Sequence, residues 1–110
     1  MDYDKLKYHH LGIPTNTPRE REVYLKDYKC YHYGYEKSEF GIEWMRYEDD
    51  CSLPEIVKTI PHIAFEVDDL EEVLKGRKVI IKPNSPSPDI IVAFIEENGA
   101  PIEFIQTIKK

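Results

Sequence analysis

Two pairs of similar segments divide this chain into halves, and the repeat constrains the fold more than any other feature of the sequence. Residues 9–15 (HHLGIPT) resemble residues 61–67 (PHIAFEV), because each places a histidine ahead of apolar and small residues. Residues 40–46 (FGIEWMR) resemble residues 100–106 (APIEFIQ), and both carry Ile-Glu-aromatic. Each half therefore opens with a histidine strand and ends with a glutamate strand, which predicts one structural unit used twice.

Local patterns predict strands and helices in a similar order in the two halves. Alternating, β-branched and aromatic runs predict strands, and Pro, Gly and Asp punctuation predicts where helices and turns begin and end. The first half is expected to contain strands at 7–14, 29–37 and 40–48, and a brief helix within 15–28 capped by Thr17. The second half is expected to contain a short helix or turn at 54–59, a helix at 68–76 and a loop at 84–88. Its expected strands are 61–67, 78–83, 89–97 and 102–108.

The two histidine strands and the two glutamate strands also agree in which face each side chain occupies. Side chains alternate between the two faces of a strand, so the bulky apolar residues of these strands share one face. The residues predicted on the opposite face are His10, Glu43, His62 and Glu103. Gly12 and Ala64 follow the two histidines by two positions and are small, which leaves space beside them. If the sheet curls, the four polar side chains converge in one cleft.

Two imidazoles and two carboxylates in one cleft suit a divalent cation. Neutral imidazole binds zinc, nickel, cobalt and iron, and carboxylates also bind manganese. Taken singly, a strand histidine is more often a hydrogen-bonded structural residue, and a strand glutamate more often faces solvent. The prediction of a metal site at His10, Glu43, His62 and Glu103 therefore depends on parity and repeat agreeing.

Length and charge limit the other possibilities. The chain has 110 residues, which predicts a single domain over 1–110, and its formal charge of −6 argues against nucleic acid or an anionic membrane as a partner. No apolar run approaches the roughly 20 residues that span a bilayer, and the N-terminus has no secretion segment. We therefore expect a cytoplasmic protein in which Cys30 and Cys51 are free thiols.

Four segments together resemble a known superfamily. HHLGI, GIEWM, PHIAFEVDDL and NGAPIEFIQ are similar to the four signature strands of the vicinal oxygen chelate proteins. These include glyoxalase I, methylmalonyl-CoA epimerase, extradiol dioxygenases, and the fosfomycin- and bleomycin-resistance proteins. The resemblance implies an α+β fold with two βαβββ modules forming a curved open mixed sheet. Module one would span about 7–50, shortened relative to the family, and module two about 60–108.

The resemblance also implies a chemistry for the four polar residues. In glyoxalase I-like members, a His and a Glu from each module hold a divalent metal, which here would be His10, Glu43, His62 and Glu103. The implied activity is that of a lyase, isomerase or epimerase acting on a small oxygenated substrate through an enolate-type intermediate. Glu103 would be the catalytic base. Two alternatives stay open: a metal-free binding module like the bleomycin-resistance proteins, and an iron-dependent extradiol-type dioxygenase.

Neighbouring residues give further expectations. Met45 and Tyr47 share the face of Glu43 and are expected to contact the substrate. His9 is expected on the apolar side, and His32 is expected to have a surface or packing role ahead of a role in tuning the site. Arg46 projects from the opposite face and is expected to form a surface ion pair or a dimer contact. A thin two-module domain with curved sheets often pairs, so we also expect a homodimer.

Overall fold

One curved mixed sheet organises the chain. The computed structural model describes residues 5–108, which form eight strands and two short α-helices. The ends of the predicted domain, 1–4 and 109–110, lie outside the described residues. The strands are β1 (Lys7–Pro14), β2 (Val23–Leu25), β3 (Cys30–Tyr33), β4 (Ile42–Tyr47), β5 (His62–Glu66), β6 (Lys78–Ser87), β7 (Ile90–Glu97) and β8 (Ala100–Thr107). The helices are α1 (Glu55–Thr59) and α2 (Leu70–Leu74), and the 3-10 turns are η2 (Lys26–Tyr28) and η3 (Tyr35–Lys37).

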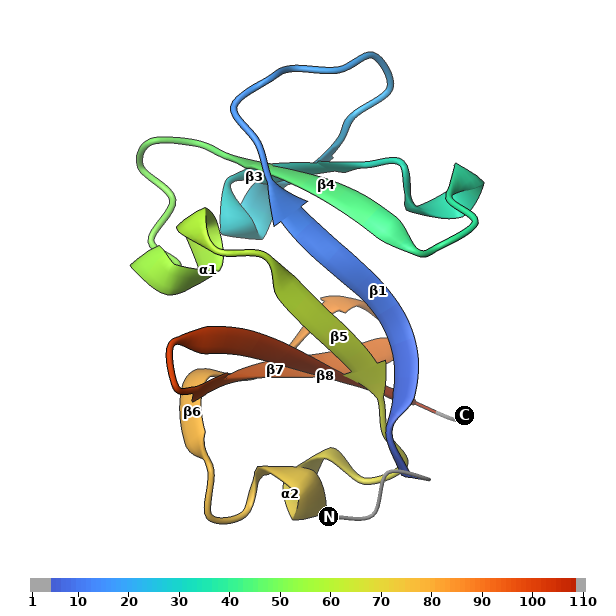
Figure 1. Cartoon of the computed structure of the whole chain (residues 1–110), viewed down its shortest axis with the longest axis vertical. Helices are drawn as coiled ribbons and strands as arrows, with labels where there is room; N and C mark the ends of the chain where they lie inside the picture. The colour runs from blue at the N-terminus through green and yellow to red at the C-terminus, as the bar shows by residue number, and fades with distance from the viewer. Residues whose placement is uncertain (1–4, 109–110) are drawn as a thin grey trace.

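The strand order repeats about the centre of the sheet, as the sequence repeat predicted. The order is β2-β3-β4-β1-β5-β8-β7-β6. Each histidine strand runs parallel to the glutamate strand of its own half, β1 beside β4 and β5 beside β8. The two halves join through the antiparallel pair of β1 and β5, which lie side by side in Figure 1. The predicted fold class, a curved open mixed sheet with few helices, is confirmed.

The helix predicted within residues 15–28 is wrong, so only the second half contains a helix between its strands. Residues 15–22 form no helix, and β2 and η2 follow them. Arg21 has a φ of 66°, a left-handed conformation that no right-handed helix accepts. Glu22 is held by Arg46 of β4 through two hydrogen bonds of 2.7 and 2.8 Å, which is the surface ion pair expected of Arg46. Thr17 donates its backbone N–H to Thr15 instead of capping a helix.

The loop predicted at 84–88 is also wrong over most of its length. β6 continues to Ser87, with three shifts of register against β7. Proline is tolerated in this strand because β6 is at the edge of the sheet, where one side needs no ladder hydrogen bonds. The predicted strand at 29–37 is shorter than expected, because Gly34 has a φ of 95° and the η3 turn follows it.

The two faces of the second half have different roles. α2 packs on the face away from the histidines, over a core formed by Val67, Leu70, Ala93, Ile95 and Phe104. Asp69 caps this helix by accepting a hydrogen bond from the backbone N–H of Glu72, as its sequence position predicted. Among residues 5–108, no helix has the length and apolar character needed to cross a bilayer.

Strand register places the four predicted ligands in two rows on the other face. Gly12 lies opposite Glu43 on one side and His62 on the other. Ala64 lies opposite His10 on one side and Glu103 on the other. Residues opposite one another in neighbouring strands point to the same face, so each row places two polar side chains around one small residue.

Gly12 determines where the ring of His62 can lie. A Cβ atom at position 12 would stand 2.1 Å from Cε1 of His62 and 2.6 Å from its Nε2. These distances are far below van der Waals contact, so the imidazole occupies the volume that any other residue's side chain would take. The small residue predicted to leave open space therefore accommodates the neighbouring histidine.

This packing predicts the effect of Gly12→Ala. The added methyl group must displace the His62 ring, which we expect to lower the free energy of unfolding by about 1–3 kcal/mol, measured by chemical denaturation. In a His62→Ala background the ring is absent, and the same substitution should cost far less. An equal cost in both backgrounds would show that the ring does not occupy this space.

Candidate metal centre

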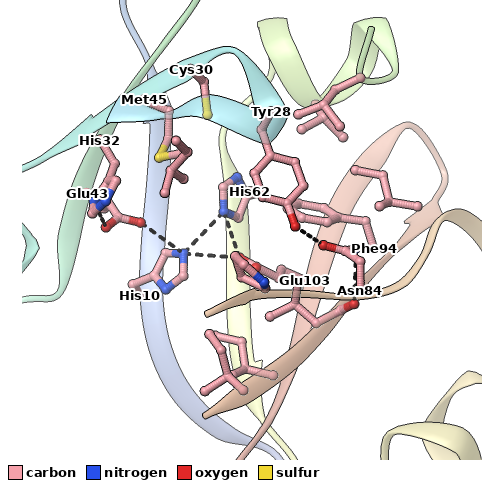
Figure 2. Close-up of a pocket in the computed structure, with 18 of the residues that line it drawn as sticks. His10, Tyr28, Cys30, His32, Glu43, Met45, His62, Asn84, Phe94 and Glu103 are labelled. Carbon is pink, nitrogen blue, oxygen red and sulfur yellow. Dashed lines mark hydrogen bonds and ion pairs between the residues drawn. The ribbon is translucent and has the colours of Figure 1, made fainter. Parts of the chain in front are cut away.

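Three side chains from the central strands meet at the floor of a cavity. Nε2 of His10 lies 3.2 Å from Nε2 of His62, and Oε1 of Glu103 lies 3.2 Å from each of these nitrogens. His10 and His62 are only 6% and 2% exposed. Figure 2 shows the three side chains pointing toward one another from β1, β5 and β8. Within the described chain, they are the group of ligand-type side chains that could hold a metal ion.

The triangle has the size that a divalent metal ion requires. Zinc bonds to nitrogen and oxygen at about 2.0–2.2 Å, which separates neighbouring ligand atoms of a tetrahedral set by about 3.3–3.5 Å. The observed edges are 3.2 Å. Two ring nitrogens and a carboxylate oxygen at these distances are stabilised by a proton or a metal ion between them. The residues present therefore fit a metal.

His62 makes its polar contacts through one atom. Its Nδ1 is buried and has no hydrogen-bond partner among residues 5–108, while Nε2 faces the cluster. The edge-to-face contact with Phe94, with ring centroids 5.0 Å apart, supports the imidazole on its apolar side. The ring is therefore oriented by packing against Phe94 and Gly12, with its available nitrogen toward the centre.

The fourth predicted ligand lies beside the triangle and has another partner. Oε1 of Glu43 is 3.6 Å from Nε2 of His10, and its Oε2 is 3.1 Å from Nδ1 of His32. The structure thus brings three of the predicted ligands together and holds Glu43 next to them. His32 contacts Glu43 at the edge of the cluster. This contact agrees with a role in tuning the site, which the sequence made the less favoured expectation. His32 lies opposite Met45, and this register places it on the face of the cluster. The sequence alone does not show that β3 pairs with β4, so this position could not be predicted.

The prediction that His9 faces the apolar side is wrong. The register of β1 shifts between Tyr8 and His10, and such a bulge interrupts the alternation on which the prediction depended. His9 lines the same cavity as His10, and their Nδ1 atoms are 2.8 Å apart. Its ring stacks on Tyr35 with centroids 5.0 Å apart and an angle of 5°. His9 therefore holds the ring nitrogen of His10 that faces away from the triangle.

The cluster keeps its carboxylate charged. Burial alone would raise the pKa of Glu103, but the hydrogen bonds and charges of His10 and His62 lower it to about 2. Burial favours neutral His10, yet the contact with Glu103 and the charge of Glu43 outweigh it and raise the pKa of His10. Burial, together with the neighbouring His10, lowers the pKa of His9. The Glu103 carboxylate therefore stays charged in the cluster, and His10 holds a proton more readily than a free imidazole does.

A cavity of about 310 Å³ opens above these residues. Met45 and Tyr47 line it together with Glu43, as parity predicted, and their contact with a substrate stays a prediction. Tyr28, which ends η2 near one edge of the sheet, donates a hydrogen bond to Asn84 of β6 at the other edge. This bridge, visible in Figure 2, joins the two edges of the curled sheet across the cavity.

Solved structures share the fold of this chain, although no family model and no curated protein matches its sequence. The crystal structure of a hypothetical protein from Bacillus halodurans C-125 is 20% identical, with a TM-score of 0.72 and coverage of 96% of both chains. That of methylmalonyl-CoA epimerase from Mycobacterium tuberculosis is 15% identical, with a TM-score of 0.66 and coverage of 94% of this chain and 89% of that one.

The chain has the vicinal oxygen chelate fold. At these identities, the likeness is one of fold. This fold explains the location of the cluster. The central strands β1, β4, β5 and β8 come from the two repeated halves and together form one concave face. The chemistry at that face depends on the side chains that this sequence places there.

The bridge between the sheet edges makes a prediction. Tyr28→Phe removes the hydroxyl that donates to Asn84, and we expect the free energy of unfolding to fall by about 1 kcal/mol in chemical denaturation. The same substitution in an Asn84→Ala background should cost less, because the partner is already absent. A cost that is independent of Asn84 would mean that the two edges are not coupled through this contact.

Proposed function

We propose that the protein is a divalent-metal-dependent enzyme that moves a proton on the carbon beside a carbonyl group of a small oxygenated substrate, as lyases, isomerases and epimerases do. The observation that carries the proposal is the 3.2 Å triangle of His10, His62 and Glu103 at the floor of a cavity. One of the neighbours in fold is a methylmalonyl-CoA epimerase, which supports this reaction type by analogy.

In this proposal, His10, His62 and Glu103 hold the metal, and Glu43 is the remaining predicted ligand. A bound divalent cation supplies a Lewis acid that stabilises negative charge on a substrate oxygen. The Nδ1 atoms of His9 and His10 are 2.8 Å apart, and the tautomer in which Nδ1 of His10 donates would leave its Nε2 lone pair free for the cation. His32 contacts the carboxylate of Glu43 and fixes its orientation beside the cluster.

Glu103 is the proposed catalytic base, alternating between holding the metal and accepting the proton. It faces the cavity, and its Oε1 lies 3.2 Å from the proposed metal-binding nitrogens of His10 and His62. A carboxylate within hydrogen-bond reach of the substrate carbon's proton is the group that general base catalysis needs. Glu43 also lines the cavity and is the second carboxylate to test.

An iron(II)-dependent oxygenase is the second candidate. Two histidines and one carboxylate with open positions are the ligand set typical of non-haem iron oxygenases, and the triangle contains this set while Glu43 contacts His32. Oxygen uptake by the iron(II)-loaded protein with a panel of catechols distinguishes this activity from proton transfer.

A homodimer and a cytoplasmic location also stay proposals. Light scattering tests the first of them.

Metal binding is the first prediction from this proposal. Protein purified without an affinity tag should bind about one equivalent of zinc, nickel, cobalt, manganese or iron(II). A metal at 100 times its Kd should stabilise the fold by about 2.7 kcal/mol and raise Tm by several degrees. His62→Ala should lose both effects, whereas His32→Ala should keep the stoichiometry. Less than about a tenth of an equivalent, with no change in Tm, would favour a metal-free binding module.

Glu103→Gln is the second prediction. With the metal-loaded protein in heavy water, we expect the α-hydrogens of 2-hydroxyacetophenone to exchange for deuterium, as followed by proton NMR. The variant should slow this exchange by about 100-fold or more, because the amide cannot accept the proton, while its unfolding transition should remain cooperative. Glu66→Gln is the matched control, since Glu66 ends the strand of His62 and does not line the cavity. Full activity in Glu103→Gln would remove the assignment.

A further inference from the structure

The cavity has titratable groups around the cluster and a largely apolar wall. His9, His32 and Glu43 border the triangle. The remaining wall is formed mainly by aliphatic, aromatic and sulfur-containing side chains, and its larger apolar members include Leu25, Met45, Leu53, Ile90, Phe94 and Ile105. No lysine or arginine among residues 5–108 lines the cavity. Outside the histidines at and around the cluster, the walls therefore offer no cationic side chain that could pair with a carboxylate or phosphate of a ligand.

Several cations elsewhere in the structure already have partners. Arg46 forms its two hydrogen bonds with Glu22, and its guanidinium lies 4.1 Å from the ring centroid of Tyr31. Lys58 donates to the backbone oxygen of Cys51 at 3.0 Å. Glu43 and Glu103 add negative charge at the floor of the cavity, and the chain as a whole carries −6. An anionic ligand would lose its hydration here without gaining a counter-charge from the wall, which is costly.

The cavity is small. Its volume of about 310 Å³ is at the lower end of the range for ligand sites, about 300–1,000 Å³. An engineered protein cavity of about 150 Å³ holds benzene, so this one has room for about a substituted aromatic ring or an aliphatic body of that size. Tyr47 is a neutral hydrogen-bond donor on the wall, because burial raises its pKa and keeps the hydroxyl protonated.

We propose that the substrate is a small uncharged molecule with an apolar body and a pair of neighbouring oxygen atoms at one end. This assignment rests on the proposed function, because the oxygen atoms face the metal held by His10, His62 and Glu103. The apolar body lies against the wall that includes Met45, Ile90 and Ile105. A ligand that places an anionic group against this wall is disfavoured, because no lysine or arginine among residues 5–108 lines it.

The test compares three chelating probes on the cobalt(II)-loaded protein. Benzohydroxamic acid has a chelating oxygen pair and an apolar ring, 4-carboxybenzohydroxamic acid adds one carboxylate, and acetohydroxamic acid lacks the ring. Binding is measured from the visible absorption of cobalt(II). We expect benzohydroxamic acid to bind at least about tenfold tighter than either of the others. Equal or tighter binding of the carboxylated probe would overturn the assignment of an uncharged substrate.

A charge placed in the wall sharpens the result. Leu53→Arg puts a cation in the cavity lining and should tighten the carboxylated probe about tenfold relative to benzohydroxamic acid. Val79→Arg is the matched control, because Val79 is exposed on β6 outside the lining, and it should leave the ratio unchanged. A changed ratio in Val79→Arg alone would contradict a site-specific effect.

The cobalt(II) titration distinguishes a failure of the proposed function from a failure of the substrate assignment. Absence of cobalt(II) binding would overturn the proposed function and this inference together. Cobalt(II) binding with no preference for the uncharged probe would overturn only the substrate class.

Discussion

The structure depends on one contact among polar groups: two imidazole nitrogens and a carboxylate oxygen face one another at 3.2 Å beneath the cavity. Burial would raise the pKa of Glu103, but the hydrogen bonds and charges of His10 and His62 lower it to about 2. A buried polar cluster of this kind contributes less to folding than apolar residues of similar volume would. Its presence in a thin core therefore indicates binding chemistry more than stability.

The fold brings these atoms together through small residues and curvature. Gly12 makes room for the His62 ring, and Ala64 separates His10 from Glu103 across two strand pairs. The curl of the sheet then brings the polar side chains around Gly12 close to those around Ala64. The hydrogen bond from Tyr28 to Asn84 joins the edges of the sheet above the cavity. The result is a polar floor beneath an apolar wall, which is the arrangement expected of a site that orients a small substrate by its oxygen atoms.

Much of this arrangement could be predicted from the sequence, because strand parity and the repeat depend on local order along the chain. Both place Glu43 and Glu103 on the face of the histidines, and the structure agrees. What failed depends on non-local contacts. The bulge before His10 turned His9 into the cavity, and Glu22 pairs with Arg46 of β4 in an irregular segment ahead of β2, where a helix was expected. The pairing of β3 with β4, which gives Glu43 its contact with His32, could not be read from either strand alone.

The most direct test of the account is X-ray diffraction from crystals grown with zinc, recorded at wavelengths on either side of the zinc absorption edge. A metal centre at this cluster predicts one anomalous peak bonded to Nε2 of His10, Nε2 of His62 and Oε1 of Glu103, at zinc–ligand distances of about 2.0–2.2 Å. An anomalous peak at another place, or none at full zinc saturation, would contradict the central claim that this cluster is a metal centre.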